Sequence, residues 1–285
     1  MSVPAPARHN AQSHTILVDG LETRYWEAGE GPPLVLLHSG EFGASAELSW
    51  EYNFAALAER YHVYAPDFLG FGATAKAHDF NDFVTFKIQH IASFCRQMGL
   101  ANVPFVGNSM GANFLIRDVA NPVPLIPASS FVAISGGGAV PANEARAALT
   151  DYDCTVPSMK RVLWALFHDP VWYEDEAYID RRFESSIIPG AWECSAAARM
   201  RAPNVVRETA YERATRNQLS YDAVKTPMLL VAGAEDKLKP RGFAHELAEQ
   251  IPSATAIEMP NVGHCAHIET PEAFHAVLFD FLDSL

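Results

Sequence analysis

The sequence predicts an α/β protein with a mostly parallel sheet that is covered by helices on both faces. Apolar runs of strand length alternate with stretches of helical periodicity along most of the chain. One run, Pro33–Leu37, is apolar at every position, which is typical of a strand buried on both faces of a sheet. Between about residues 139 and 222 the alternation stops, and this segment is rich in aromatic and helix-forming residues.

The expected elements follow in a regular order from the N-terminus. A hairpin spans residues 15–28, with Asp19 and Gly20 at its turn. Further strands are expected at 33–37, 62–65, 103–106, 130–135, 228–232 and 255–259. Helices are expected at 54–60, 83–98, 112–118, 244–250 and 272–282.

These elements divide the chain into three parts. Residues 1–14 read as a flexible N-terminal tail, and 15–138 together with 223–285 read as the core. Because an insertion at the carboxyl ends of parallel strands lies over the ligand crevice, we expect 139–222 to form a helical lid. A second small domain without a catalytic role is the alternative.

The bulk properties exclude several classes of protein. A formal net charge of −13 argues against nucleic acid or an anionic membrane as a partner. The four cysteines lack the spacing of a disulfide framework or a zinc site, so we expect reduced thiols. We also expect neither a metal nor an organic cofactor. No apolar stretch is long enough to span a bilayer, and Met1 to His14 lacks the apolar centre of a signal peptide. We therefore expect a cytoplasmic protein whose partner is a small-molecule substrate, with homo-oligomer formation left open.

The pentapeptide Gly107-Asn108-Ser109-Met110-Gly111 lies between an expected strand and an expected helix. A serine at such a sharp turn adopts strained backbone angles, and small residues two before and two after it prevent clashes. Its hydroxyl is exposed at a helix N-terminus, where N–H groups stabilise negative charge. We expect Ser109 to be a nucleophile, with a simple helix cap as the alternative.

A nucleophilic serine needs a base, and the base needs an acid that orients it. Two candidate acids, Glu235 and Asp236, and two candidate bases, His264 and His267, follow the pentapeptide, which we call the elbow. Each pair lies beyond the end of an expected strand. For the acid we favour Asp236 over Glu235 because it lies deeper in its loop. For the base we favour His264 over His267, because Gly263 allows a close approach.

An acyl-transfer site also needs N–H donors for the oxyanion. The backbone N–H of Met110 is one candidate, since it directly follows the serine. The loop His38-Ser39-Gly40-Glu41 after the strand 33–37 is the other source, and Gly40 is our choice. An ordinary strand-to-helix turn is the alternative for this loop, and His38 is expected to be structural.

With these motifs in order, the chain resembles the α/β-hydrolase family over residues 15–138 and 223–285. The resemblance implies an eight-stranded, mostly parallel sheet with a helical lid inserted after the sixth strand. Asp67, in Asp67-Phe68-Leu69-Gly70-Phe71-Gly72, matches the loop after the family's fourth strand and is expected to be structural. A serine at the elbow separates the chain from the haloalkane dehalogenases and epoxide hydrolases, which place an aspartate there.

Within the family, the elbow and the Asp67 loop are most similar to the meta-cleavage product hydrolases. These enzymes cleave a carbon–carbon bond in dienoates formed by aromatic ring opening. The resemblance implies that Arg182, in Arg182-Phe183-Glu184, binds the dienoate end, with Asn108 and Ser39 as further substrate ligands. A surface ion pair of Arg182 with Asp180 or Glu184 is the alternative.

Two positions depart from the subfamily. Glu41 stands where another glycine is usual, and Cys265 follows the histidine where tryptophan is common. The sequence therefore predicts a serine-dependent hydrolase, with carbon–carbon bond cleavage in a meta-cleavage-type dienoate as the first hypothesis. A carboxylesterase or lactonase with the same triad is the second, and a non-catalytic ligand receptor of the same fold is the third.

Overall fold

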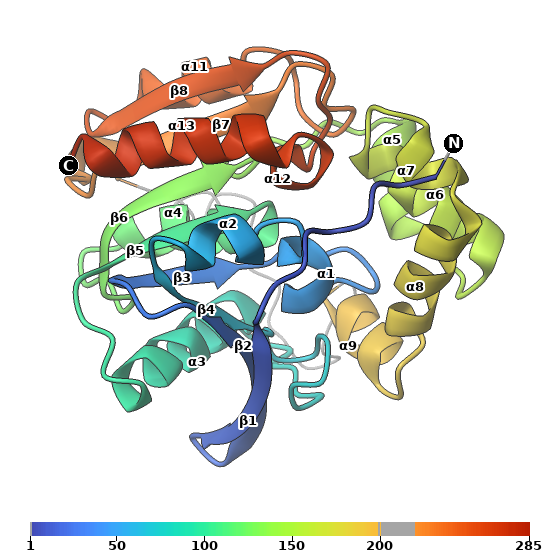
Figure 1. Ribbon diagram of the computed structural model, residues 1–285, viewed down its shortest axis with the longest axis horizontal. Helices are drawn as coiled ribbons and strands as arrows, with labels where there is room; N and C mark the ends of the chain where they lie inside the picture. The colour runs from blue at the N-terminus through green and yellow to red at the C-terminus, as the bar shows by residue number, and fades with distance from the viewer. Residues whose placement is uncertain (1, 199, 201–219) are drawn as a thin grey trace.

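The structure is a computed structural model, and it describes residues 2–198, 200 and 220–285 (Figure 1). Its centre is an eight-stranded sheet in the order β1-β2-β4-β3-β5-β6-β7-β8. β1 and β4 each pair antiparallel with β2, and all other neighbours are parallel. The strands are β1 (Gln12–Val18), β2 (Leu21–Ala28), β3 (Pro33–Leu37), β4 (His62–Pro66), β5 (Val103–Asn108), β6 (Ala128–Ile134), β7 (Met228–Gly233) and β8 (Ala254–Met259).

Helices cover both faces of the sheet, because successive side chains of each buried strand point to opposite faces. In β3, Val35 and Leu37 pack toward α3 (Phe83–Gln97), α4 (Met110–Val119) and α11 (Phe243–Ala248). Leu34 and Leu36 pack toward α1 (Ala46–Trp50), α2 (Phe54–Ala58) and α13 (Pro271–Asp283). The apolar run at 33–37 is thus a central strand between two cores, as predicted.

The segment between β6 and β7, here called the insertion, follows the sixth strand, and its described regular elements are helices. Its helices are α5 (Glu144–Thr150), α6 (Val156–Leu166), α7 (Val171–Glu174), α8 (Glu176–Ser186) and α9 (Ala191–Ala197), and a 3₁₀ turn, Tyr221–Ala223, precedes β7. Phe167 and Trp172 stack at 5.2 Å between ring centroids, inside the insertion's own core. Figure 1 shows these helices grouped beside one edge of the core.

The observed elements differ from the expected ones at a few places. β1 begins at Gln12, three residues before the expected hairpin. In the segment that precedes β1, the Val3 N–H donates a hydrogen bond to the Asp175 carboxylate in the insertion. The short helices α1 and α12 (Ala266–Glu269) were not predicted, because four or five residues are too few to show a helical period. Among the described helices, none has the length and apolar content needed to cross a bilayer.

Candidate active site

Ser109 stands at a strained turn between β5 and α4. Its backbone has φ 49° and ψ −103°, a conformation that L residues rarely adopt. A Cβ on Gly107 would come within 2.6 Å of Ala112 N, and one on Gly111 within 2.6 Å of Leu37 O. The two glycines are therefore required by close backbone contacts, as the pentapeptide predicts.

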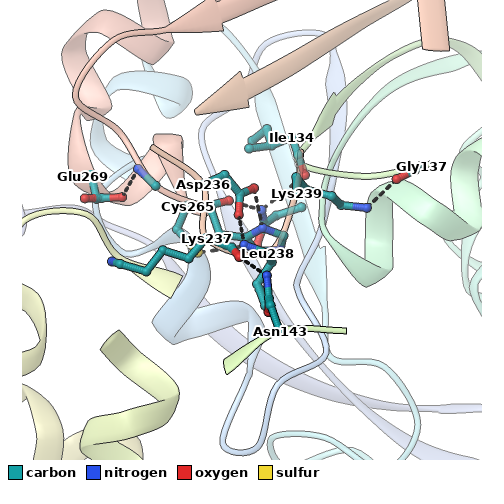
Figure 2. Close-up of polar contacts among 12 residues, drawn as sticks. Ile134, Gly137, Asn143, Asp236, Lys237, Leu238, Lys239, Cys265 and Glu269 are labelled. Carbon is teal, nitrogen blue, oxygen red and sulfur yellow. Dashed lines mark hydrogen bonds and ion pairs between the residues drawn. The ribbon is translucent and has the colours of Figure 1, made fainter. Parts of the chain in front are cut away.

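His264 and Asp236 meet beyond the ends of β8 and β7. His264 Nδ1 lies 2.7 Å from Asp236 Oδ2, and both side chains are almost fully buried. The other carboxylate oxygen of Asp236 accepts the Leu238 N–H at 2.8 Å (Figure 2). Because Nδ1 is engaged by the acid, Nε2 is the ring nitrogen left for proton transfer.

The electrostatics of this pair favour an ionised acid. Burial would raise the pKa of Asp236, but the attraction of His264 and the hydrogen bonds it accepts lower that pKa below its ordinary value. An ionised Asp236 can stabilise a positive charge that forms on the imidazole during proton transfer.

The competing residues lie elsewhere. Glu235 is exposed to solvent, so it has no role in the pair. His267 is fully buried with its ring 4.5 Å from that of Trp50, and burial lowers its pKa to about 3. His38 is equally buried, and one ring nitrogen accepts the Phe68 N–H at 2.9 Å while the other donates to the carbonyl of Ser39. Both of these histidines are held neutral inside the fold.

The two expected oxyanion donors lie against each other. A Cβ on Gly40 would come 2.7 Å from Met110 Sδ and 2.9 Å from Met110 Cβ. Within the described residues, we find no protein acceptor for the backbone N–H of either residue. Gly40 is thus packed against Met110, and the role of their two N–H groups as oxyanion donors stays a prediction.

Ser109 and His264 line one cavity of about 470 Å³. Gly40 and Met110 lie on the same wall, and the insertion contributes Arg146 and Leu166. The other lining residues are Glu41, Phe83, Val84, Asn113, Phe114, Arg117, Val140, Leu149, Thr150, Leu238 and Lys239. A space of this size with mixed apolar and polar walls suits a small organic substrate.

Arg182 lies behind this cavity and not on its wall. The side chain is buried, and its Nη2 donates to Glu41 Oε1 in an ion pair that is itself almost fully enclosed. The pairing with Asp180 or Glu184 that we considered is absent, and the neighbouring Arg181 pairs instead with Glu51 at 2.5 Å. The structure therefore does not place Arg182 where a substrate in this cavity would contact it.

The other two expected substrate ligands are also buried. Asn108 donates from Nδ2 to the carbonyls of Ile134 and His264, at 3.3 and 3.2 Å, so its amide holds the histidine loop. Ser39 is 2% exposed, and neither residue is on the cavity wall. The buried aromatic residues Phe167 and Trp172 belong to the insertion's core and do not line this cavity.

Sequence reasoning missed Glu269, which anchors the loop of His264 to the insertion. Its Oε1 accepts the Gly263 N–H at 2.7 Å, and its Oε2 accepts the N–H groups of His168 and Asp169 at 2.8 and 3.1 Å. The His264 N–H donates to Leu166 O at 2.7 Å. No local pattern marks Glu269, because its partners in the insertion are about 100 residues away.

Two further observations bear on cofactors and redox state. All four cysteines are free thiols, as the spacing predicts. In the part of the chain that the structure describes, no cluster of three or more histidine, cysteine, aspartate or glutamate side chains could hold a metal ion.

The fold and site define an α/β hydrolase, and comparison with known proteins agrees. The chain belongs to the alpha/beta hydrolase family, whose model matches residues 34–277. It is 32% identical over 275 residues, 92% of this chain and 88% of the relative, to 2-hydroxy-6-oxo-6-(2'-aminophenyl)hexa-2,4-dienoic acid hydrolase of Metapseudomonas resinovorans.

Two of the solved structures that are similar to this chain are those of hydrolases. The crystal structure of CarC, a serine hydrolase involved in carbazole degradation, matches with a TM-score of 0.78 and 28% identity, over 96% of this chain and 100% of that chain. A mutant of the meta-cleavage product hydrolase CumD matches with a TM-score of 0.81 and 25% identity, over 95% of this chain and 98% of that chain. The chain is thus a hydrolytic enzyme most similar to meta-cleavage product hydrolases, as the elbow and its neighbouring loops predict.

Proposed function

We propose that this enzyme is a serine-dependent hydrolase that cleaves a carbon–carbon bond in a meta-cleavage-type dienoate. The observation that carries the proposal is the 2.7 Å contact of Asp236 with a histidine that shares a cavity with Ser109. The names of similar proteins support the substrate class, since one acts on an aminophenyl hexadienoic acid and another on meta-cleavage products.

In the proposed mechanism, His264 moves protons and Ser109 supplies the attacking oxygen. Through Nε2, His264 first assists ketonisation of the dienol and then activates Ser109 or a water molecule. Attack on the carbonyl beside the bond to be broken gives an oxyanion, which the N–H groups of Gly40 and Met110 stabilise. Collapse of this oxyanion breaks the carbon–carbon bond, and the leaving fragment takes up the proton that His264 holds. When Ser109 is the attacking group, a water molecule activated by His264 then hydrolyses the acyl group left on the serine; when water attacks, the acid is released directly. Asp236 holds the imidazole in the required tautomer throughout.

A carboxylesterase or lactonase activity is the second candidate, and the Glu41–Arg182 ion pair favours it. Arg182, the cation that the resemblance implies for carboxylate binding, already has an internal carboxylate, although Arg117, Arg146 and Lys239 also line the cavity. An ester without a second charged group needs no such cation, and the same serine and histidine would attack it.

The test follows the loss of a coloured ring-cleavage dienoate and the hydrolysis of a p-nitrophenyl ester by the same purified enzyme. Dienoate cleavage faster than ester hydrolysis is expected. Ser109→Ala should lower kcat for both by about 10³-fold or more, because the activated nucleophile is lost. Rapid ester hydrolysis without dienoate loss would replace the first proposal by the second.

A further inference from the structure

Glu41 separates a buried cation from the cavity that contains Ser109. The side chains of Arg182 and Glu41 are only 1% and 3% exposed, and the two are joined by an ion pair. Glu41 belongs to the loop after β3 and lines the cavity, whereas Arg182 comes from α8 and does not. A substrate in the cavity would therefore meet the carboxylate before the guanidinium.

The guanidinium of Arg182 retains donors that no acceptor uses. Among the described residues, its Nε and Nη1 have no hydrogen-bond partner although both atoms are buried. A guanidinium binds a carboxylate through two adjacent nitrogens, either Nη1 and Nη2 or Nε and Nη2. Both pairs include Nη2, which already donates to Glu41. Glu41 thus competes for the guanidinium edge that a carboxylate ligand would need.

A second arginine–glutamate pair lies next to the first and shows what is particular about Glu41. Arg181 and Glu51 are 2.5 Å apart, but Arg181 is 43% exposed and neither residue lines the cavity of Ser109. The Arg182–Glu41 pair therefore differs from the Arg181–Glu51 pair in two ways: its cation is buried, and its carboxylate lines the cavity. Glu51 is therefore a matched control for Glu41.

We propose that Glu41 is a specificity-determining residue that masks Arg182 and so reduces the preference of this site for negatively charged substrates. Removing one partner of a buried ion pair leaves the other charge uncompensated. Loss of Glu41 would present a cation to the cavity, loss of Arg182 would present an anion, and loss of both would present neither. This inference rests on the proposed function only in taking the cavity of Ser109 as the substrate site.

The experiment measures a charge preference with two esters that differ in one group. One is the mono-p-nitrophenyl ester of adipic acid, and the other is the same ester with its free carboxylate replaced by a carboxamide. The ratio of kcat/KM for the charged ester to that for the neutral ester is determined for wild type, Glu41→Gln, Arg182→Met, the double variant and Glu51→Gln, with circular dichroism to confirm folding.

Glu41→Gln should raise this ratio about tenfold or more, mainly through KM, since one charge-assisted hydrogen bond becomes available to the substrate. Arg182→Met should lower the ratio, while the double variant and Glu51→Gln should stay close to wild type. The double variant leaves no buried charge unpaired, so its ratio can still contradict the inference if a single variant fails to fold.

A ratio in the double variant far below that of wild type would overturn the inference, because Arg182 would then bind the substrate's carboxylate directly. A folded Glu41→Gln with an unchanged or lower ratio would overturn it as well. The ratio is measured with ester substrates only. If the enzyme cleaves no dienoate, the proposed function is refuted, but the conclusion about Glu41 is unaffected.

Discussion

Among single residues, Asp236 shows how a turn selects one acid of two neighbours. The chain reverses after β7, where the Asp236 N–H donates to Gly233 O at 3.2 Å. A Cβ on Gly233 would come 2.0 Å from Gly263 O, so the loops of the acid and the histidine are in close contact there. This turn directs Asp236 toward His264 and leaves Glu235 in solvent.

Replacing Asp236 by asparagine should therefore lower kcat by about 10⁴-fold while the fold is kept, because an amide favours the wrong tautomer of the histidine. Glu235→Gln is the matched control and should leave kcat unchanged. Steady-state kinetics on a p-nitrophenyl ester would measure both. A similar loss in the two variants would mean that Asp236 has no special part in orienting His264.

The sequence predicts residues of the site best where a motif is local. Gly107, Ser109 and Gly111 are close in sequence, and their steric requirement is visible in five letters. The ion-pair partner of Arg182 could not be predicted, because Glu41 is 141 residues away and no local pattern links them. Long-range pairs of this kind depend on tertiary packing, which periodicity does not encode.

At the scale of secondary-structure elements, the buried strands were predictable because continuous apolar runs have few alternatives. β3 has the predicted bounds, Pro33–Leu37, and the strands from β4 to β8 differ from the prediction by one or two residues at one or both ends. The short α12 was not predicted, although it carries Glu269 and so connects the histidine loop with the insertion.

The stability that Glu269 contributes by connecting the histidine loop with the insertion should depend on pH. Burial, opposed by the hydrogen bonds from Asp169, Gly263 and His168, raises the pKa of Glu269 from 4.5 to about 7. A carboxyl group whose pKa is higher in the folded state than in the unfolded state stabilises the fold while it is protonated. This contribution is fully present below the pKa of the unfolded state and is lost as pH rises through the pKa of the folded state. The contribution should therefore fall between about pH 4.5 and 7.

Glu269→Gln removes this titration, so the difference in unfolding free energy between wild type and variant should fall as pH rises across that window. Denaturant unfolding at several pH values measures the difference. Glu272→Gln, at an exposed position in α13, is the control and should follow wild type. Parallel curves for wild type and Glu269→Gln would contradict the assignment.

On the scale of the whole molecule, the N-terminal tail connects the core with the insertion. Figure 1 shows the N-terminus beside α6 and α7. The Val3 N–H donates to Asp175 Oδ2 at 3.0 Å, and the Tyr52 hydroxyl donates to Pro4 O at 3.0 Å. These contacts could not be predicted, because the polar and Pro/Ala-rich residues of the tail show no periodicity that would reveal them.

Deleting residues 2–8 should lower the melting temperature by a few degrees, at about 2–4 °C for each kcal/mol of lost stability in a protein of this size. The core should remain folded, since its two clusters involve other residues. Thermal unfolding by circular dichroism measures the effect. Tyr52→Phe removes one contact alone and should have a smaller effect; an unchanged melting temperature after the deletion would show that the tail contributes nothing.

The anchoring of the histidine loop to Leu166, His168 and Asp169 restricts how this enzyme can be engineered. Exchanging the whole helical segment for that of a relative would also replace the carbonyl and N–H groups that fix the backbone at His264. A chimaera designed to accept new substrates should therefore keep residues 164–169 and Glu269 together, and vary the sequence only beyond them.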